Sequence, residues 1–209
     1  KYGTGELTFK GTVNETGAYF LNLRTGTFRA AEGANIAINA ASRETLRMTE
    51  GTSVARTCIV ETGAVVVAGG VMTGSGPSNT VHVNGGSLTF TGSGVGGESG
   101  LIRTVEDVSG ADRFIVDAGA LTFSDDDWLS MGVRGGGAEI VVNGGTATFG
   151  RLSLGVRADT NFSSTGVATY SKIWVNGGVM DVVGAFNWMG DIRVGRVNQV
   201  YLNGGTLRL

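Results

Sequence analysis

Apolar and polar residues alternate in short runs along most of this chain, and the runs come in pairs separated by a tight bend. In the block VHVNGGSLTF at 81–90, Val81 and Val83 flank His82, and the same alternation resumes after Asn-Gly-Gly. A period of two residues is typical of half-buried β-strands, because successive side chains point to opposite faces. Asn-Gly-Gly suits a bend with positive φ. Each block therefore predicts strand, bend, strand.

The block repeats along the chain. It recurs at 140–149, 173–182 and 200–209, and weaker copies lie at 21–30, 58–67 and 114–123. With the second Gly of each bend as the marker, the intervals from Gly26 to Gly86, Gly86 to Gly145 and Gly145 to Gly205 are 60, 59 and 60 residues. Short strand-like pieces at 152–155 and 192–195 supply a third strand in several units, as stacked coils of a parallel β-helix require.

These patterns predict an all-β fold, a right-handed parallel β-helix (β-solenoid) of about seven or eight coils with little or no α-helix. One domain covers 1–209, with less regular coils at 1–80 and regular coils with Asn-Gly-Gly bends at 81–209. An antiparallel hairpin is the competing interpretation of Asn-Gly between two strands. Only residues 42–48 favour a short helical turn. Stacking predicts two inward columns: Leu88, Leu121, Ala147, Met180 and Leu207, then Phe90, Phe123, Phe149, Val182 and Leu209.

Composition agrees with a folded chain. The 209 residues include 37 Gly but 1 Pro, and 41% are hydrophobic, which excludes collagen and low-complexity disorder. The net charge is -2 with no run of Lys or Arg, so neither nucleic acid nor an anionic membrane is an expected partner. No apolar run reaches the roughly 18–20 residues of a membrane span. The chain starts at Lys1 without Met, and we expect a processed protein or part of a longer one.

The cadence VNGGSLTF, VNGGTATFGRLSLG, VNGGVMDVV and LNGGTLRL resembles the Gly-rich β-strand repeats of bacterial autotransporter-associated and PEP-CTERM-type surface proteins. The resemblance covers nearly the whole chain and is clearest from Val81 onward. It implies a secreted β-solenoid that lies outside the cell or at its surface.

Few residues carry candidate chemistry. The acidic cluster Asp125, Asp126 and Asp127 offers oxygen ligands of the kind Ca²⁺ prefers, although a solvated loop is the alternative and no other cofactor is expected. Cys58 is placed on the inward face as a small hydrophobic residue, with an intermolecular disulfide as the sharper alternative. N-glycosylation sequons begin at Asn14 and Asn161.

Two columns of the stack are candidates for contacts between coils or with partners. The bend residues are expected to hydrogen-bond from coil to coil: Asn84, Asn143, Asn176 and Asn203. A second column points outward although it is largely apolar, and it is either a partner surface or covered by a long loop such as 91–100: His82, Ile115, Val141, Trp174 and Tyr201.

Three classes of function compete. The first is an extracellular structural protein, a subunit of a self-assembling fibre whose uncapped ends stack head to tail through Leu7 and Phe9 on one copy and Leu207 and Leu209 on the next. The second is an adhesin or a glycan-binding passenger domain. The third is a polysaccharide lyase or hydrolase. We expect no enzyme, since hydrolysis needs two convergent carboxylates and no telling spacing links the scattered acids Glu106, Asp107, Asp112 and Asp117.

Overall fold

The chain is an all-β protein whose strands pair in parallel. The computed structural model describes residues 3–15, 21–38, 46–48, 55–73, 78–91, 100–102, 111–131, 136–154, 169–187 and 197–209. Within these ranges it forms one 18-stranded sheet without any helix, and each strand pairing is parallel. Hence no helix in the described ranges is long and apolar enough to cross a bilayer.

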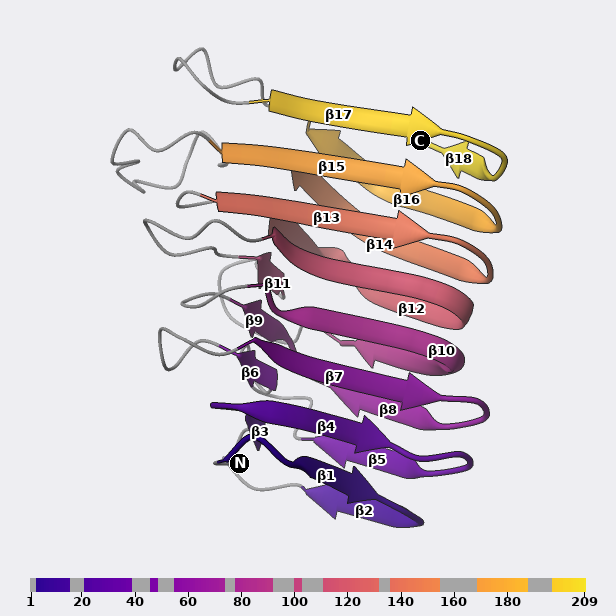
Figure 1. Ribbon diagram of the computed structural model, residues 1–209. Coiled ribbons are helices and arrows are strands. Elements are labelled where there is room, and N and C mark those ends of the chain that lie inside the picture. The colour runs from indigo at the N-terminus through magenta and orange to yellow at the C-terminus, as the bar shows by residue number, and fades with distance from the viewer. Residues whose placement is uncertain are drawn as a thin grey trace.

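The sheet consists of three ladders, each a series of parallel strands that pair one with the next. Along the chain, a strand of the first ladder is followed by one of the second and then by one of the third. The first ladder holds eight strands that pair in chain order: β1 (Glu6–Phe9), β4 (Gly26–Ala30), β7 (Arg56–Glu61), β10 (Thr80–Phe90), β12 (Ala111–Met131), β13 (Gly136–Val142), β15 (Thr169–Val175) and β17 (Val197–Leu202). Figure 1 shows these strands stacked from the indigo N-terminal end to the yellow C-terminal end.

The second and third ladders run beside the first. The second comprises β2 (Thr12–Glu15), β5 (Asn35–Ile38), β8 (Val65–Ala68), the later parts of β10 and β12, β14 (Thr146–Leu154), β16 (Val179–Asn187) and β18 (Thr206–Arg208). The third comprises β3 (Leu21–Asn22), β6 (Leu46–Met48), β9 (Val71–Thr73), β11 (Gly100–Ile102) and the ends of β12, β14 and β16. Since β10 and β12 continue through the bend, the ladders join into one sheet.

The predicted inward columns are confirmed from Leu88 to Leu207 and from Phe90 to Val182. The register pairs Leu88 with Leu121, and Phe90 with Phe123, and continues coil by coil. Phe123 is fully buried, and its ring centroid lies 4.7 Å from that of Phe90 and 5.4 Å from that of Phe149. Aromatic pairs at this separation add attraction beyond the burial of their surface.

The bends explain the repeated glycines. Gly145 has φ +67°, and a Cβ placed there would lie 2.4 Å from the carbonyl oxygen of Gly119 in the neighbouring coil. The position therefore needs both a left-handed backbone and the absence of a side chain, and only glycine meets both conditions. Asn143 lies two residues before Gly145, so glycine and not asparagine supplies the positive φ of this bend.

Two sequence predictions before residue 81 are wrong. The copy at 21–30 is out of phase, because 26–30 is already the first strand of its coil and its bend follows at Gly33, with φ +69°. The bend glycine of this coil is therefore Gly33. The interval of 60 residues from Gly26 to Gly86 does not join equivalent positions. Residues 46–48 form β6, where pairing with β3 and β9 outweighs the local helical preference.

Candidate binding face and polar columns

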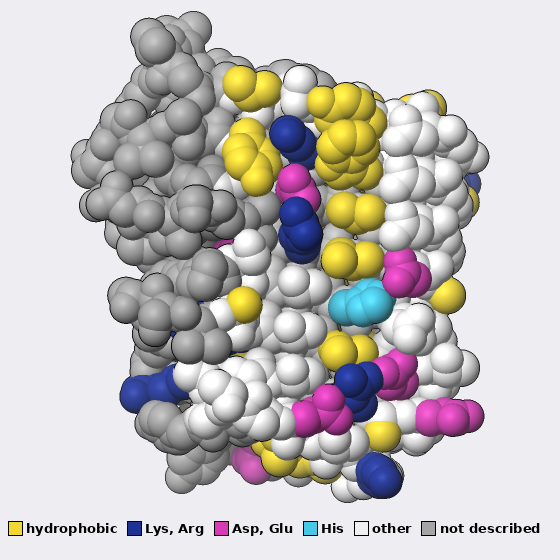
Figure 2. Space-filling view, in the orientation of Figure 1, with side chains coloured by type: hydrophobic (Ala, Val, Ile, Leu, Met, Phe, Trp, Pro, Cys, Tyr) yellow, Lys and Arg dark blue, Asp and Glu magenta, His cyan; other side chains and the backbone are white. Residues whose placement is uncertain are grey.

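The outward column is brought together as the sequence predicts. Strand register aligns His82 with Ile115, Val141, Trp174 and Tyr201 in turn. All five side chains are half-buried. Figure 2 shows the column as a vertical stripe on the surface, with its member His82 in cyan below the other four. The rings of Trp174 and Tyr201 stack with centroids 3.9 Å apart and planes 8° from parallel. The column is therefore an exposed apolar surface in this view.

Polar bend residues flank the column on one side. Asn203 Nδ2 donates to Asn176 Oδ1 at 2.7 Å, and Asn176 Nδ2 donates to Asn143 Oδ1 at 2.8 Å. Asn143 Nδ2 then donates to Asp117 Oδ1 at 2.7 Å. These bonds confirm coil-to-coil hydrogen bonding between stacked amides for Asn143, Asn176 and Asn203, and Asn84 bonds to its neighbouring coil through a different partner. Hydrogen bonds from Asn143 and then from His82 hold the pKa of Asp117 below its usual value.

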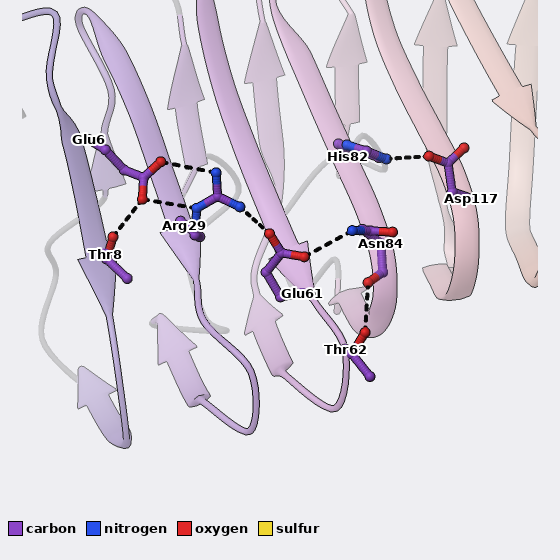
Figure 3. A network of polar contacts seen from close by, with 8 residues as sticks. All are labelled: Glu6, Thr8, Arg29, Glu61, Thr62, His82, Asn84 and Asp117. Carbon is purple, nitrogen blue, oxygen red and sulfur yellow. Dashed lines mark hydrogen bonds and ion pairs between the residues drawn. The ribbon is translucent and has the colours of Figure 1, made fainter.

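Asn84 behaves differently from the other three. Its Nδ2 donates to Glu61 Oε2 at 3.0 Å in the preceding coil, and Glu61 pairs with Arg29, which also binds Glu6 at 2.9 Å (Figure 3). The strand pairing shifts register next to Asn84, which separates it from the Asn column. His82 bridges this break, since its Nε2 lies 2.7 Å from Asp117 Oδ2. The Arg29 guanidinium lowers the pKa of Glu6.

A charged column borders the other side of the outward column. Arg113, Glu139 and Lys172 are aligned by the register, and Arg113 Nε lies 2.9 Å from Glu139 Oε2. Lys172 Nζ lies 4.7 Å from the ring centroid of Tyr170. Burial, followed by the charge of Glu139, raises the pKa of Tyr170. The sequence interpretation did not single out these four residues, although they alternate with buried ones in the same strands.

A buried polar column also escaped the sequence interpretation. Arg56, Asn79 and Asp112 are at most 1% exposed. Arg56 Nη1 donates to Asn79 Oδ1 at 2.9 Å, and the backbone N and Nδ2 of Asn79 both donate to Asp112 Oδ1, at 2.8 and 2.9 Å. Burial raises the pKa of Asp112 to about 6, against the hydrogen bonds from Asn79. Each member stands two residues before an inward strand residue, so the alternation extended backwards would have found it.

The scattered acids that we weighed for catalysis are not brought together where the structure describes them. Asp112 points into the core, whereas Asp117 is exposed at the bend. Glu106 and Asp107 lie outside the described residues. Cys58 is inward and buried, as predicted, and burial raises the pKa of its thiol to about 12. A thiol with this pKa is a poor nucleophile at neutral pH.

The metal and glycosylation hypotheses stay predictions. The backbone of Asp125, Asp126 and Asp127 lies in β12, but their side chains fall outside the described part. Among the side chains that the structure describes, no group of three His, Cys, Asp or Glu is placed to hold a metal ion. Asn14 is exposed in β2, and Asn161 lies outside the described residues.

Leu209 is exposed, and Leu7, Phe9 and Leu207 are half-buried. The two pairs lie in different ladders, so Leu207 and Leu209 do not continue the columns of Leu7 and Phe9 as predicted. Leu7 and Phe9 belong to the first ladder, through β4, whereas Leu207 belongs to the second, through β16. Val13 in β2 is the N-terminal equivalent of Leu207. An open cavity of about 300 Å³ lies at this end, lined by Phe9, Val13, Glu15, Leu21, Phe28, Ile36 and Ile38.

Glu15 is exposed in the N-terminal coil, at a register position that core residues occupy in the later coils. It pairs with Ile38, which pairs with Ala68, so the carboxylate stands in the column that Phe90 and Phe123 continue. Charges that point inward at an end coil are one way in which sheet edges are protected from further pairing. The sequence interpretation, which found no cap at either end, missed this feature.

In comparisons with known proteins, no family model, no curated protein and no solved structure matches the chain.

Proposed function

We propose that the chain is a right-handed parallel β-solenoid that serves outside the cell as a structural protein, a subunit of a fibre in which copies stack head to tail. Its three ladders of parallel strands support the solenoid, because every strand pairing among the described residues joins one coil to the next. The sequence resemblance supports the location outside the cell.

One observation carries the proposal: the inward columns are buried through the middle of the stack, and their residues in the first and last described coils are partly or largely exposed. Val142 and Val175 are fully buried, whereas Leu202, the next residue of that column, is 59% exposed. At the other end Phe9 of the same column is half-buried. A further coil laid on either end would cover this apolar surface and satisfy the unpaired strand edge.

The corrected register defines how two copies would meet. β17 of one copy would lie on β1 of the next, and β18 would lie on β2, so that Leu202 covers Phe9 and Leu207 covers Val13. Asn203, which follows Leu202, would then stand beside Lys10, which follows Phe9. An amide oxygen accepts a hydrogen bond from an ammonium group, so the Asn column would continue into the neighbour. Glu15 opposes the contact, because Leu209 would cover its carboxylate.

Analytical sedimentation at rising protein concentration, with negative-stain imaging, tests the proposal. We expect the mean mass to grow with concentration, and the double variant Leu202→Lys/Leu207→Lys to remain a monomer with unchanged circular dichroism. Val65→Lys is the matched control, because Val65 is an exposed apolar residue away from both ends. Glu15→Leu should lengthen the assemblies. A wild-type chain that stays monomeric at high concentration would refute the fibre.

A further inference from the structure

One strand carries an ordered row of outward side chains that the fibre does not use. In β15, Tyr170, Lys172 and Trp174 follow one another at every second position, between the buried residues Ser171, Ile173 and Val175, and Asn176 continues this alternation just after the strand. Alternate residues of a strand are about 6.6 Å apart, so Tyr170 and Trp174 are separated by about 13 Å. We call these four residues the β15 row.

The first aromatic residue of the row lies over a neighbouring strand. A Cβ at Gly137 of β13 would stand 2.0 Å from Cζ of Tyr170, so the ring occupies the space that any other residue would fill. Lys172 Nζ contacts the same ring at 4.7 Å from its centroid. Glycine below and a cation beside it hold this ring in place on the surface.

The second aromatic residue is held just as firmly. Trp174 stacks on Tyr201 and continues the outward column above Val141. Parallel rings at 3.9 Å leave little rotational freedom, so a ligand here would find surface that is already ordered, which lowers the entropic cost of binding. Lys172 stands between Tyr170 and Trp174 in the row, and Figure 2 shows two separate hydrophobic patches near the C-terminal end with charged side chains between them.

Hydrogen-bonding groups of both kinds lie between and beyond the rings. Lys172 donates and Glu139 accepts between the two aromatic residues, and Asn176 stands beyond Trp174. The Asn column uses one of the two N–H groups of each amide, so the second can donate to a ligand. The charges of Arg113 and Glu139 offset each other, which leaves Lys172 as the only charge of the row.

From this arrangement we infer that the β15 row is a binding site for an uncharged oligosaccharide. A pyranose ring has an apolar C–H face, which aromatic rings accept, and a rim of hydroxyl groups that donate and accept hydrogen bonds. Two aromatic positions with amide, ammonium and carboxylate groups around them match this division along one extended chain. A protein partner would favour a continuous apolar centre, and here the charged column interrupts it.

Isothermal titration calorimetry with cellohexaose, hexa-N-acetylchitohexaose and polygalacturonate tests the site on the intact chain. We expect one neutral hexasaccharide to bind in the millimolar to micromolar range. Tyr170→Ala and Trp174→Ala should each lower the association constant about tenfold or more. Tyr170→Phe should bind as the wild type does, since it keeps the ring. Thr122→Ala, on the outward face of the second ladder, is the matched control and should change nothing.

Several outcomes would overturn the inference. Absence of heat with all three sugars at millimolar concentration would overturn the inference, as would binding that survives the double variant Tyr170→Ala/Trp174→Ala. Binding of polygalacturonate alone, lost in Lys172→Met, would show an anionic ligand and overturn the assignment to uncharged sugars. Circular dichroism of each variant separates lost binding from lost folding. The result is independent of the fibre, because a monomer can bind sugar.

Discussion

Asp112 should make the protein more stable in mild acid than at neutral pH. Its carboxyl group is buried, Oδ2 has no hydrogen-bond partner among the described residues, and its pKa rises from 3.8 to about 6. Because the folded state binds the proton more tightly than the unfolded state, the stabilisation is complete below pH 3.8. It is lost as the pH rises to about 6.

The size of the effect follows from the shift. One pKa unit corresponds to about 1.4 kcal/mol, so the ionised carboxylate costs about 3 kcal/mol above pH 6 relative to its protonated form. Asp112→Asn replaces the carboxylate with a neutral group of the same shape that still accepts from Asn79. We expect the variant to match the wild type near pH 4 and to exceed its free energy of unfolding by up to about 3 kcal/mol at pH 7.5.

Urea unfolding followed by circular dichroism from pH 4 to pH 7.5 measures this difference. Asp117→Asn is the control: the pKa of Asp117 is lowered and its contribution is lost only as the pH falls below the usual carboxyl range, so its difference from the wild type should change little from pH 4 to pH 7.5. A difference between wild type and Asp112→Asn that stays constant over this pH range would show that Asp112 does not titrate as argued. The buried column with Arg56 would then hold the carboxylate ionised.

Further predictions concern the core and the bends. Phe123→Ala should lower the free energy of unfolding by about 3–5 kcal/mol in urea titrations, whereas Thr122→Ala next to it should change it little, since Thr122 points outward. Gly145→Ala should destabilise the protein more than Gly33→Ala, measured as the shift of the melting temperature, because only at Gly145 does the added Cβ meet a backbone oxygen at 2.4 Å. Cys58 should resist a thiol reagent in the native protein and react in urea, in line with its pKa of about 12; fast native labelling would contradict its burial.

The sequence predicts the all-β class, the parallel stacking and the inward columns. In each strand every second side chain is apolar and faces the core, and the repeat of the same block places these side chains above one another. It also predicts the outward column and the hydrogen bonds of Asn143, Asn176 and Asn203, since identical residues at one bend position meet when coils stack. These features repeat, and repetition gives the register directly.

What does not repeat was missed. Glu6–Phe9 has the same alternation as a strand of either ladder, and only its pairing with β4 assigns it to the first. Arg56 and Asp112 are charged residues of types usually found on the surface, yet both lie in the core, where Arg56 donates to Asn79 and Asp112 Oδ1 accepts from it. The Lys172 contact with Tyr170 depends on a glycine in another strand, which no local pattern reveals.

The break beside Asn84 has a mechanical meaning. Bonds between coils run along the stack, so a pull on the two ends loads every junction equally, and the weakest junction sets the force at which the body parts. At β10 and β12 the register shifts twice, and the bend there is joined by His82 and Asp117 instead of by a pair of amides. Along the bend column we therefore expect this junction to open under tension before the amide-paired junctions between Asn143, Asn176 and Asn203.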